Sequence, residues 1–242
     1  MLFPIVAFQE PPPFRVLIVQ PTYDIAKRDR GLGSLENAAS GQLVEDALRK
    51  LGISNITVIK FGAGDAASPA TAMRQAIKTF LIEQSRPGER LIVYYTGHGQ
   101  QIADDNGPRD EADGEDEAWV MPLGTDEEEH EHIRDDELTE WIERASDKIG
   151  LGEGTARLLI LSDSCHSGTM IDERVDATGN EAAAILAAPG ASDENLFDRG
   201  LVYIASSSSG ALTKFAFIGE KRGEAIGFRA GPIALALHDE VV

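Results

Sequence analysis

Residues 90–99 read Arg-Leu-Ile-Val-Tyr-Tyr-Thr-Gly-His-Gly and contain the two features that decide the fold. The first six residues form a short apolar run rich in β-branched and aromatic side chains. Such a run is typical of a strand buried on both faces of a parallel sheet. A polar, glycine-rich segment follows at the point where that strand would end. Ligands of parallel α/β sheets bind beyond the carboxyl ends of the strands, so this segment is predicted to be functional.

The same strand pattern recurs four times along the chain, at residues 14–20 (FRVLIVQ), 56–61 (ITVIKF), 157–161 (RLLIL) and 201–205 (LVYIA). Apolar residues at helical spacing, or helix-start signals, occur between and after these runs, at residues 36–51, 68–87, 135–148 and from 231 onward. Residues 118–123 are expected to form a short strand or a hairpin arm. Strands that alternate with helices predict an α/β fold with a mainly parallel central sheet, flanked by helices on both faces.

The 242 residues suit one large domain, or at most two small ones. We expect an extended N-terminal arm at residues 1–13, where three prolines favour a non-helical path, and one domain over residues 14–242. Residues 172–200 lack periodicity and are expected to form a mobile loop within it. No apolar run approaches the ~20 residues that a membrane span needs. The N-terminus has no basic region typical of a signal peptide, so a cytoplasmic location is expected.

The net charge of −19 argues against nucleic acid and anionic membranes as partners, because both need clustered Lys and Arg. Most of this charge is local. Residues 104–153 hold 20 Asp and Glu but only 4 Lys and Arg, a net charge of −16. Two interpretations are open for this region: a solvated, self-repelling loop, or a site for a divalent cation.

The only cysteine of the chain, Cys165, follows the run at 157–161, as His98 follows the run at 90–95. If these strands are neighbours, a thiol and an imidazole emerge at the same edge of the sheet. A nearby imidazole lowers the pKa of a thiol and protonates a leaving amine. A lone cysteine is more often a packing residue, but the Ser, Asp and His beside Cys165 favour a reactive thiol. The backbone amides of Gly99 and Cys165 are candidate donors to an oxyanion.

His166 is a competing base, because it stands next to the cysteine. Adjacent residues on a turn usually point apart, which favours His98. The two segments, Tyr-Tyr-Thr-Gly-His-Gly at 94–99 and Asp-Ser-Cys-His-Ser-Gly at 163–168, resemble those of the metacaspases and their bacterial relatives among the caspase-like cysteine peptidases. The resemblance extends over about residues 14–240. It implies a caspase-hemoglobinase fold, a His98/Cys165 dyad and peptide-bond hydrolysis through a thioacyl intermediate, with no cofactor needed for the chemistry.

The resemblance also implies a specificity. Metacaspases use the aspartate that matches Asp163 to bind Arg or Lys before the cleaved bond; the alternative is a structural carboxylate that caps the turn. Ser40 stands where the family usually has a second pocket aspartate, which is a departure from the family pattern. Thr96 and Ser206 are expected to line the same pocket.

Many metacaspases need calcium as a regulatory ion, although some bacterial relatives do not. By motif position the ligands would be Asp116, Asp135, Asp136 and Asp172. The other acidic residues, Asp104, Asp105 and those at 126–129, are expected to belong to a solvated loop.

The loop at 172–200 contains Arg174 and Arg199, which are candidate processing sites for the protein itself or for an activating protease. A passive surface loop is the alternative. The expected partner is a polypeptide substrate, with an activating protease or a regulatory subunit as a further partner, and the expected state is a monomer. Two rival functions remain: a pseudo-peptidase that binds basic peptides or acts as a scaffold, and a calcium-sensing module.

Overall fold

A computed structural model describes residues 14–23, 35, 39–62, 68–105, 114–125, 129–150, 157–167, 201–207, 216–221, 224–230 and 232–241. The N-terminal arm and the loop at 172–200 lie outside these residues. Their boundaries therefore stay predictions.

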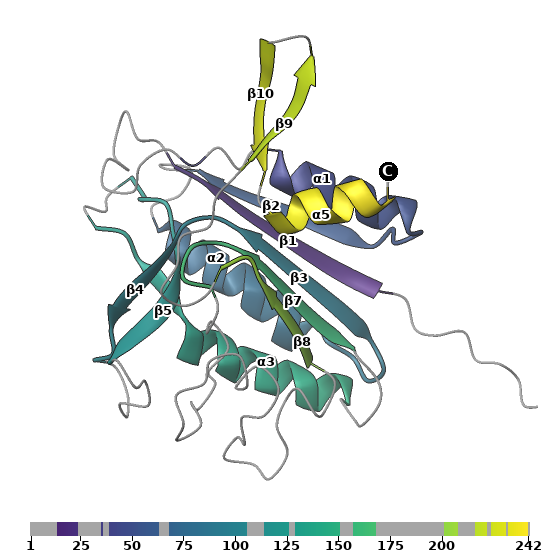
Figure 1. Ribbon diagram of the computed structural model, residues 1–242. Helices are drawn as coiled ribbons and strands as arrows, with labels where there is room; N and C mark the ends of the chain where they lie inside the picture. The colour runs from purple at the N-terminus through teal and green to yellow at the C-terminus, as the bar shows by residue number, and fades with distance from the viewer. Residues whose placement is uncertain are drawn as a thin grey trace, which may run out of the picture.

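The core of the molecule is a five-stranded sheet in the order β2-β1-β3-β7-β8, and every neighbouring pair in it is parallel (Figure 1). All five strands were predicted from their apolar runs. Their bounds are β1 (Phe14–Thr22), β2 (Ile56–Gly62), β3 (Arg90–Thr96), β7 (Leu158–Asp163) and β8 (Leu201–Ala205). The runs at 90–95 and 157–161 are neighbouring strands, as the sequence analysis expected, since β3 pairs with β7.

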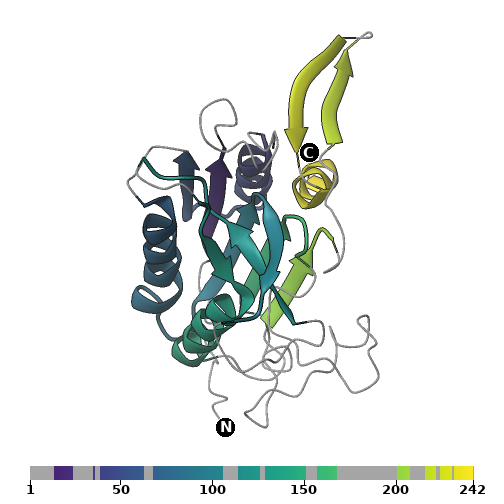
Figure 2. The ribbon, with the colours of Figure 1, turned by 90° about the vertical axis from the view of Figure 1, so that its left-hand side faces the viewer.

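Helices cover both faces of this sheet (Figure 2). One face carries α1 (Ser40–Lys50) and α5 (Pro232–Val241), and the other carries α2 (Pro69–Lys78) and α3 (Asp135–Ile149). Successive strand residues face opposite layers, so Tyr94 belongs to the core beneath α1 and α5 while Tyr95 belongs to the core beneath α2 and α3. No helix of the described part is long and apolar enough to cross a membrane.

Helix bounds differ slightly from the predicted ones. Helix α1 begins at Ser40 rather than at residue 36, and α2 continues past Lys78 as a π-helical turn, η1 (Thr79–Glu83). Gly52 follows α1 with a φ of 83°, a left-handed conformation that glycine adopts without strain.

Two small antiparallel sheets were missed by the sequence analysis. The strands β4 (Gly99–Ala103), β5 (Glu115–Val120) and β6 (His132–Arg134) form one, in the order β4-β5-β6. The strands β9 (Ala216–Lys221) and β10 (Glu224–Ala230) form the other. Only residues 118–123 were expected to be extended in the first of these regions. The others are short and lack a clear apolar alternation, so period-based reasoning gave no strand there.

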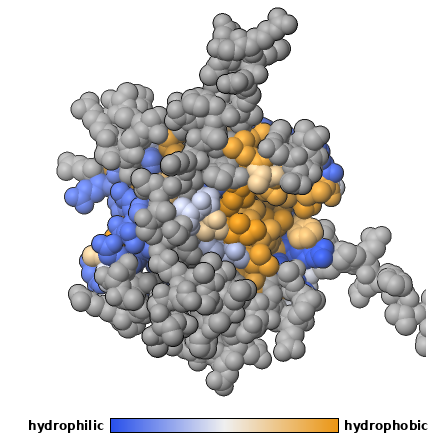
Figure 3. Space-filling view, in the orientation of Figure 1, coloured by the Kyte–Doolittle hydropathy of each residue, from blue (hydrophilic) through white to orange (hydrophobic). Residues whose placement is uncertain are grey.

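Among the described residues, the face that carries α1 and α5 exposes some apolar side chains. Figure 3 shows apolar side chains gathered on this side of the molecule. Val202 and Ile204, on the edge strand β8, are 38% and 45% exposed. A pocket of about 510 Å³ opens near the amino ends of the strands, and its lining includes Phe14, Leu48, Ile92, Leu159 and Leu237.

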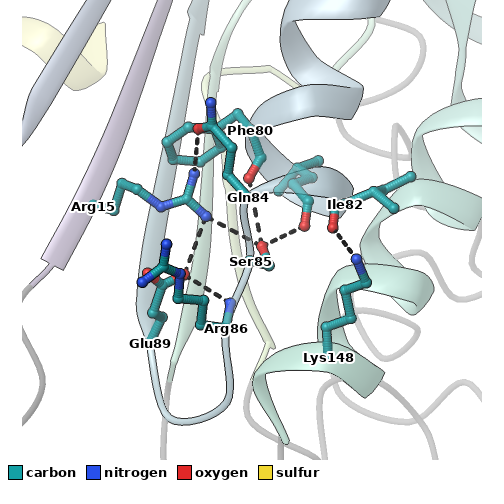
Figure 4. A network of polar contacts seen from close by, with 9 residues as sticks. Arg15, Phe80, Ile82, Gln84, Ser85, Arg86, Glu89 and Lys148 are labelled. Carbon is teal, nitrogen blue, oxygen red and sulfur yellow. Dashed lines mark hydrogen bonds and ion pairs between the residues drawn. The ribbon is translucent and has the colours of Figure 1, made fainter.

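Arg15 ties the amino end of β1 to the segment that follows η1 (Figure 4). Its guanidinium donates to Gln84, Ser85 and Glu89, at 3.2 Å each, and lies 4.2 Å from the centroid of the Phe80 ring. The Arg15 side chain is only 11% exposed, so these contacts are little screened by water. They lie at the opposite end of the sheet from the loops that carry His98 and Cys165.

We predict that Arg15→Met lowers the free energy of unfolding by about 2 kcal/mol, because it leaves the partly buried Glu89 without its cation. Arg49→Met is the matched control. Arg49 forms an exposed pair with Glu45 one helical turn away, worth at most about 0.5 kcal/mol. Urea unfolding of both variants measures the difference, and equal losses would contradict the assignment.

Candidate active site

The segments that carry His98 and Cys165 touch each other at the carboxyl edge of the sheet. Thr96 and Asp163, the last residues of β3 and β7, lie side by side in the register of the two strands. Beyond them the Gly97 amide donates to the carbonyl oxygen of Asp163 (3.3 Å). The structure therefore brings together the two loops that the sequence analysis paired.

Glycine is needed on both sides of His98. A Cβ at Gly99 would overlap the carbonyl oxygen of Cys165, and one at Gly97 would overlap the Tyr95 hydroxyl. At Gly99 no side chain fits between the two loops, so their close approach requires glycine there, whereas at Gly97 the space is taken by the side chains of Tyr95 and Pro21. The predicted oxyanion donors, the Gly99 and Cys165 amides, thus belong to two segments in contact.

Two tyrosines hold the backbone of His98. The His98 amide donates to the Tyr23 hydroxyl (3.0 Å), and the two rings lie 4.6 Å apart, tilted by 60°. The Tyr95 hydroxyl donates to the carbonyl oxygen of His98 (2.8 Å), which also accepts the Val120 amide (3.0 Å). The Tyr23 hydroxyl in turn donates to the Val120 carbonyl (2.8 Å). Burial, followed by the neighbouring Tyr23, raises the pKa of Tyr95 well above its usual range, so its hydroxyl remains a donor.

Trp119 of β5 connects this framework to the cysteine loop. Its ring stacks on Tyr95, with centroids 4.3 Å apart and planes 11° apart. Its indole N–H donates to the Ser162 hydroxyl (3.0 Å), which lies 2.9 Å from the hydroxyl of Ser164. The stacked pair of Tyr95 and Trp119 therefore reaches both loops, because Tyr95 bonds to His98 and Trp119 bonds to Ser162.

Strand β8 holds the cysteine turn from its other side. The Ser207 hydroxyl donates to the Ser164 carbonyl (3.0 Å), and the Tyr203 hydroxyl donates to the Ser167 carbonyl. His166 has a φ of 49°, in the left-handed region that residues other than glycine rarely adopt. The chain thus turns sharply directly after Cys165. The choice of His98 over His166 as the base stays a prediction.

Asp163 is fully buried and caps α5. One carboxylate oxygen accepts the Ile233 amide (3.0 Å), and the other accepts the Ala234 amide (3.1 Å) and the Tyr94 hydroxyl (2.8 Å). Burial raises the pKa of Asp163, although these donors favour the charged form. Asp163 therefore has a structural capping role, but it caps the start of α5 and not its own turn, as the alternative interpretation had expected.

The four predicted pocket residues share one buried polar cluster around Tyr94. Burial, and then the charge of Asp163, raise the pKa of Tyr94 well above its usual range, while the hydroxyls of Thr96 and Ser40 partly offset this. The Ser206 hydroxyl bonds to Asp163. The sequence analysis did not assign Tyr94 to this pocket. Strand alternation was the available indication, because Tyr94 faces the same side as Thr96.

Two of the candidate calcium ligands, Asp116 and Asp135, already have other partners. Asp116, 2% exposed, forms an ion pair with Arg134. Both oxygens of Asp135 accept backbone N–H groups, from Glu117 (3.1 Å) and Asp136 (3.0 Å). Burial, together with the charges of Glu117 and Asp116, raises the pKa of Asp135 to about 8. Within the described residues, no three His, Cys, Asp or Glu side chains are grouped as metal ligands.

Asp104 was expected in a solvated loop, and this expectation is wrong. The residue is only 3% exposed, because the hairpin of β4 and β5 continues past Ala103 and the Asp104 amide donates to the Gly114 carbonyl (3.1 Å). The remaining predicted residues, Asp172, Arg174 and Arg199, lie outside the described part of the chain.

Comparison with known proteins agrees with this geometry. The family model of the metacaspase peptidase C14 domain matches residues 44–174. Metacaspase-1 of Cryptococcus neoformans is 32% identical over 160 residues, which are 63% of this chain and 32% of that protein. Metacaspase-4 of Arabidopsis thaliana is 31% identical over 125 residues, which are 52% of this chain and 27% of that protein. The chain thus spans about a third of the length of the curated relatives it matches.

A solved structure has the same fold. Protein GSU0716 from Geobacter sulfurreducens aligns with a TM-score of 0.50 and 22% sequence identity, over 92% of this chain and 79% of that one. The parallel sheet with helices on both faces is the predicted caspase-hemoglobinase architecture. With half of its residues matched by the family model, the chain belongs to the metacaspases, a family of cysteine peptidases.

Proposed function

We propose that the protein is a cysteine endopeptidase that cleaves after arginine or lysine, with Cys165 as nucleophile and His98 as general acid and base. The contact of the two loops at the carboxyl edge of the sheet carries this proposal. Gly99, next to His98, packs directly against the carbonyl of Cys165, so the residues of the dyad stand on touching segments.

The chemistry follows from the two groups. His98 takes the proton of the Cys165 thiol, and the sulfur attacks the carbonyl carbon of the scissile bond. The negative oxygen that forms is placed to accept N–H groups of Gly99 and Cys165. The protonated His98 then gives its proton to the leaving amine, and the C–N bond breaks to leave a thioacyl enzyme. Water, deprotonated by His98, attacks this thioester and releases the acid with restoration of the thiol.

A rigid framework supports an active enzyme over a scaffold. Catalysis depends on holding the reacting groups in one geometry. Here Tyr23 and Tyr95 fix the backbone of His98. Trp119 joins this unit to Ser162, three residues before the nucleophile. A binding module has no need for such precise support of a cysteine and a histidine.

The buried carboxylate of Asp163 supports the basic preference. Among the described residues, no Lys, Arg or His forms an ion pair with it, and its pKa is raised by burial. A substrate guanidinium or ammonium placed beside it would supply the missing cation, whereas an acidic side chain would be repelled.

An irreversible acyloxymethyl ketone that carries arginine separates a peptidase from a scaffold, because only a competent thiolate is alkylated. We expect one mass increment per chain by intact mass spectrometry, none in Cys165→Ala, and no peptide hydrolysis by that variant. Ser207→Ala is the control for the turn itself, because it removes a contact to Ser164 and keeps the thiol. Full hydrolysis by Cys165→Ala would disprove the mechanism.

Tyr23→Phe tests the support of His98. The variant keeps the ring next to His98 but removes the acceptor of its amide and the donor to Val120. Loss of these two bonds should cost about 1–2 kcal/mol, which corresponds to a roughly 5–30-fold lower kcat with KM nearly unchanged. The pH profile of Cys165 alkylation should shift as well, since the imidazole sets the thiolate fraction. An unchanged kcat and profile would show that Tyr23 only packs.

Substrates that differ only in charge test the specificity. Citrulline has nearly the shape of arginine without its positive charge. A buried ion pair with Asp163 should favour the arginine peptide over the citrulline peptide by about 2 kcal/mol, or roughly 30-fold in kcat/KM. Asp163→Asn should reduce this ratio toward one, with circular dichroism as the check that α5 is retained. Equal turnover of the two peptides by the unsubstituted protein would remove the proposed preference.

A further inference from the structure

Arg134 joins three strands of the sheet that begins with the catalytic loop. As the last residue of β6, it donates through its guanidinium to the carbonyl of Ala103 at the end of β4 (2.9 Å) and to Asp105 just beyond (3.0 Å). The same group bonds to the carboxylate of Asp116 on β5. The far end of the β4–β5 hairpin is therefore fastened to β6 by one side chain.

This hairpin carries the base of the proposed dyad. Strand β4 starts at Gly99, directly after His98, and pairs with β5 along its whole length. The His98 carbonyl accepts the amide of Val120, the last residue of β5. A movement of the hairpin would therefore move His98.

The hairpin buries two acidic side chains of β5. Asp116 and Glu117 are each only 2% exposed, and a buried ionised carboxylate is costly unless a positive charge or hydrogen bonds compensate for the lost water. The planar guanidinium of arginine can contact several oxygens at once, which suits a site with acceptors on different strands. Arg134 supplies that charge at Asp116, with 22% of its own side chain exposed.

Two of the implied calcium ligands, Asp116 and Asp135, are not arranged to bind a calcium ion. Calcium takes about six to eight oxygen ligands. One of the implied ligands, Asp116, is occupied by Arg134, and both oxygens of another, Asp135, accept backbone N–H groups.

We propose that the Arg134 guanidinium takes the place of the calcium ion that many metacaspases need, and that it positions the hairpin, and with it His98, without a metal. The proposal rests on the proposed function only for the role of His98. Arg134 is a positioning residue, because it acts on the dyad through the strands it joins.

Thermal unfolding in EDTA and in millimolar calcium tests the substitution of one cation by another. The unsubstituted protein should melt at the same temperature in both. Arg134→Leu should melt roughly 6–12 °C lower in EDTA, because Asp116 loses its cation. Calcium should restore most of this loss, because the substitution frees the carboxylates of Asp116 and Asp105 to bind it. Arg144→Leu is the matched control, since Arg144 pairs with Glu140 on the exposed surface of α3 and should respond to neither treatment.

Arg134→Lys keeps the charge but not the planar guanidinium, so its melting temperature in EDTA should lie between those of the unsubstituted protein and Arg134→Leu. It replaces Arg134→Leu in the experiment if that variant does not fold. Calcium that raises the melting temperature of the unsubstituted protein by several degrees would overturn the proposal. So would an Arg134→Leu variant that melts normally in EDTA, or one that calcium does not restore.

Peptidase activity, measured separately, distinguishes the two proposals. Arg134→Leu should lose at least about tenfold in kcat/KM well below its melting temperature, and regain it in calcium. An unsubstituted protein that cleaves no basic peptide but shows the expected melting behaviour would refute the proposed function alone. An active protein that needs calcium would refute only the role of Arg134.

Discussion

The parallel pairing of β3 with β7 determines the position of every group in the candidate active site. Because the two strands run in the same direction and end at the same level, the segments after Thr96 and Asp163 leave the sheet together. An amide-to-carbonyl bond between Gly97 and Asp163 continues the ladder one step beyond the sheet. Two neighbouring strands in the correct register therefore suffice to bring the segments of His98 and Cys165 together.

Strand alternation then separates two tasks. Tyr94 and Tyr95 are consecutive, fully buried, and on opposite faces. Tyr95 supports the backbone of His98 on the side of α2 and α3. Tyr94 contacts the carboxylate of Asp163 on the side of α1 and α5. One face of β3 thus supports the proposed dyad and the other contacts the proposed specificity pocket, and a register slip by one residue would exchange the two tyrosines.

The strands, their neighbourhood and the meeting of the two loops followed from sequence, because buried parallel strands leave continuous apolar runs and functional residues follow them directly. The side chains that hold the site in place did not follow from sequence. Tyr23 stands near the end of β1, and its contact with His98 depends on tertiary packing across 75 residues. Arg134 appeared only as one of the few cations in an acidic region, and its partners come from two other strands. The burial of Asp104 was missed because charge alone suggested solvent.

Asp163 links the pocket to the C-terminal helix. A carboxylate accepts about four hydrogen bonds, and Asp163 already accepts them from Tyr94, Ser206 and the amides of Ile233 and Ala234. The two amides are fixed by the start of α5, whereas a hydroxyl can rotate toward another acceptor. In an enzyme that binds arginine here, Ser206 or Tyr94 must therefore yield its bond to the incoming guanidinium. In such an enzyme the two amides would keep the helix capped while the substrate binds, so recognition of a basic side chain would add charge neutralisation without loosening the fold.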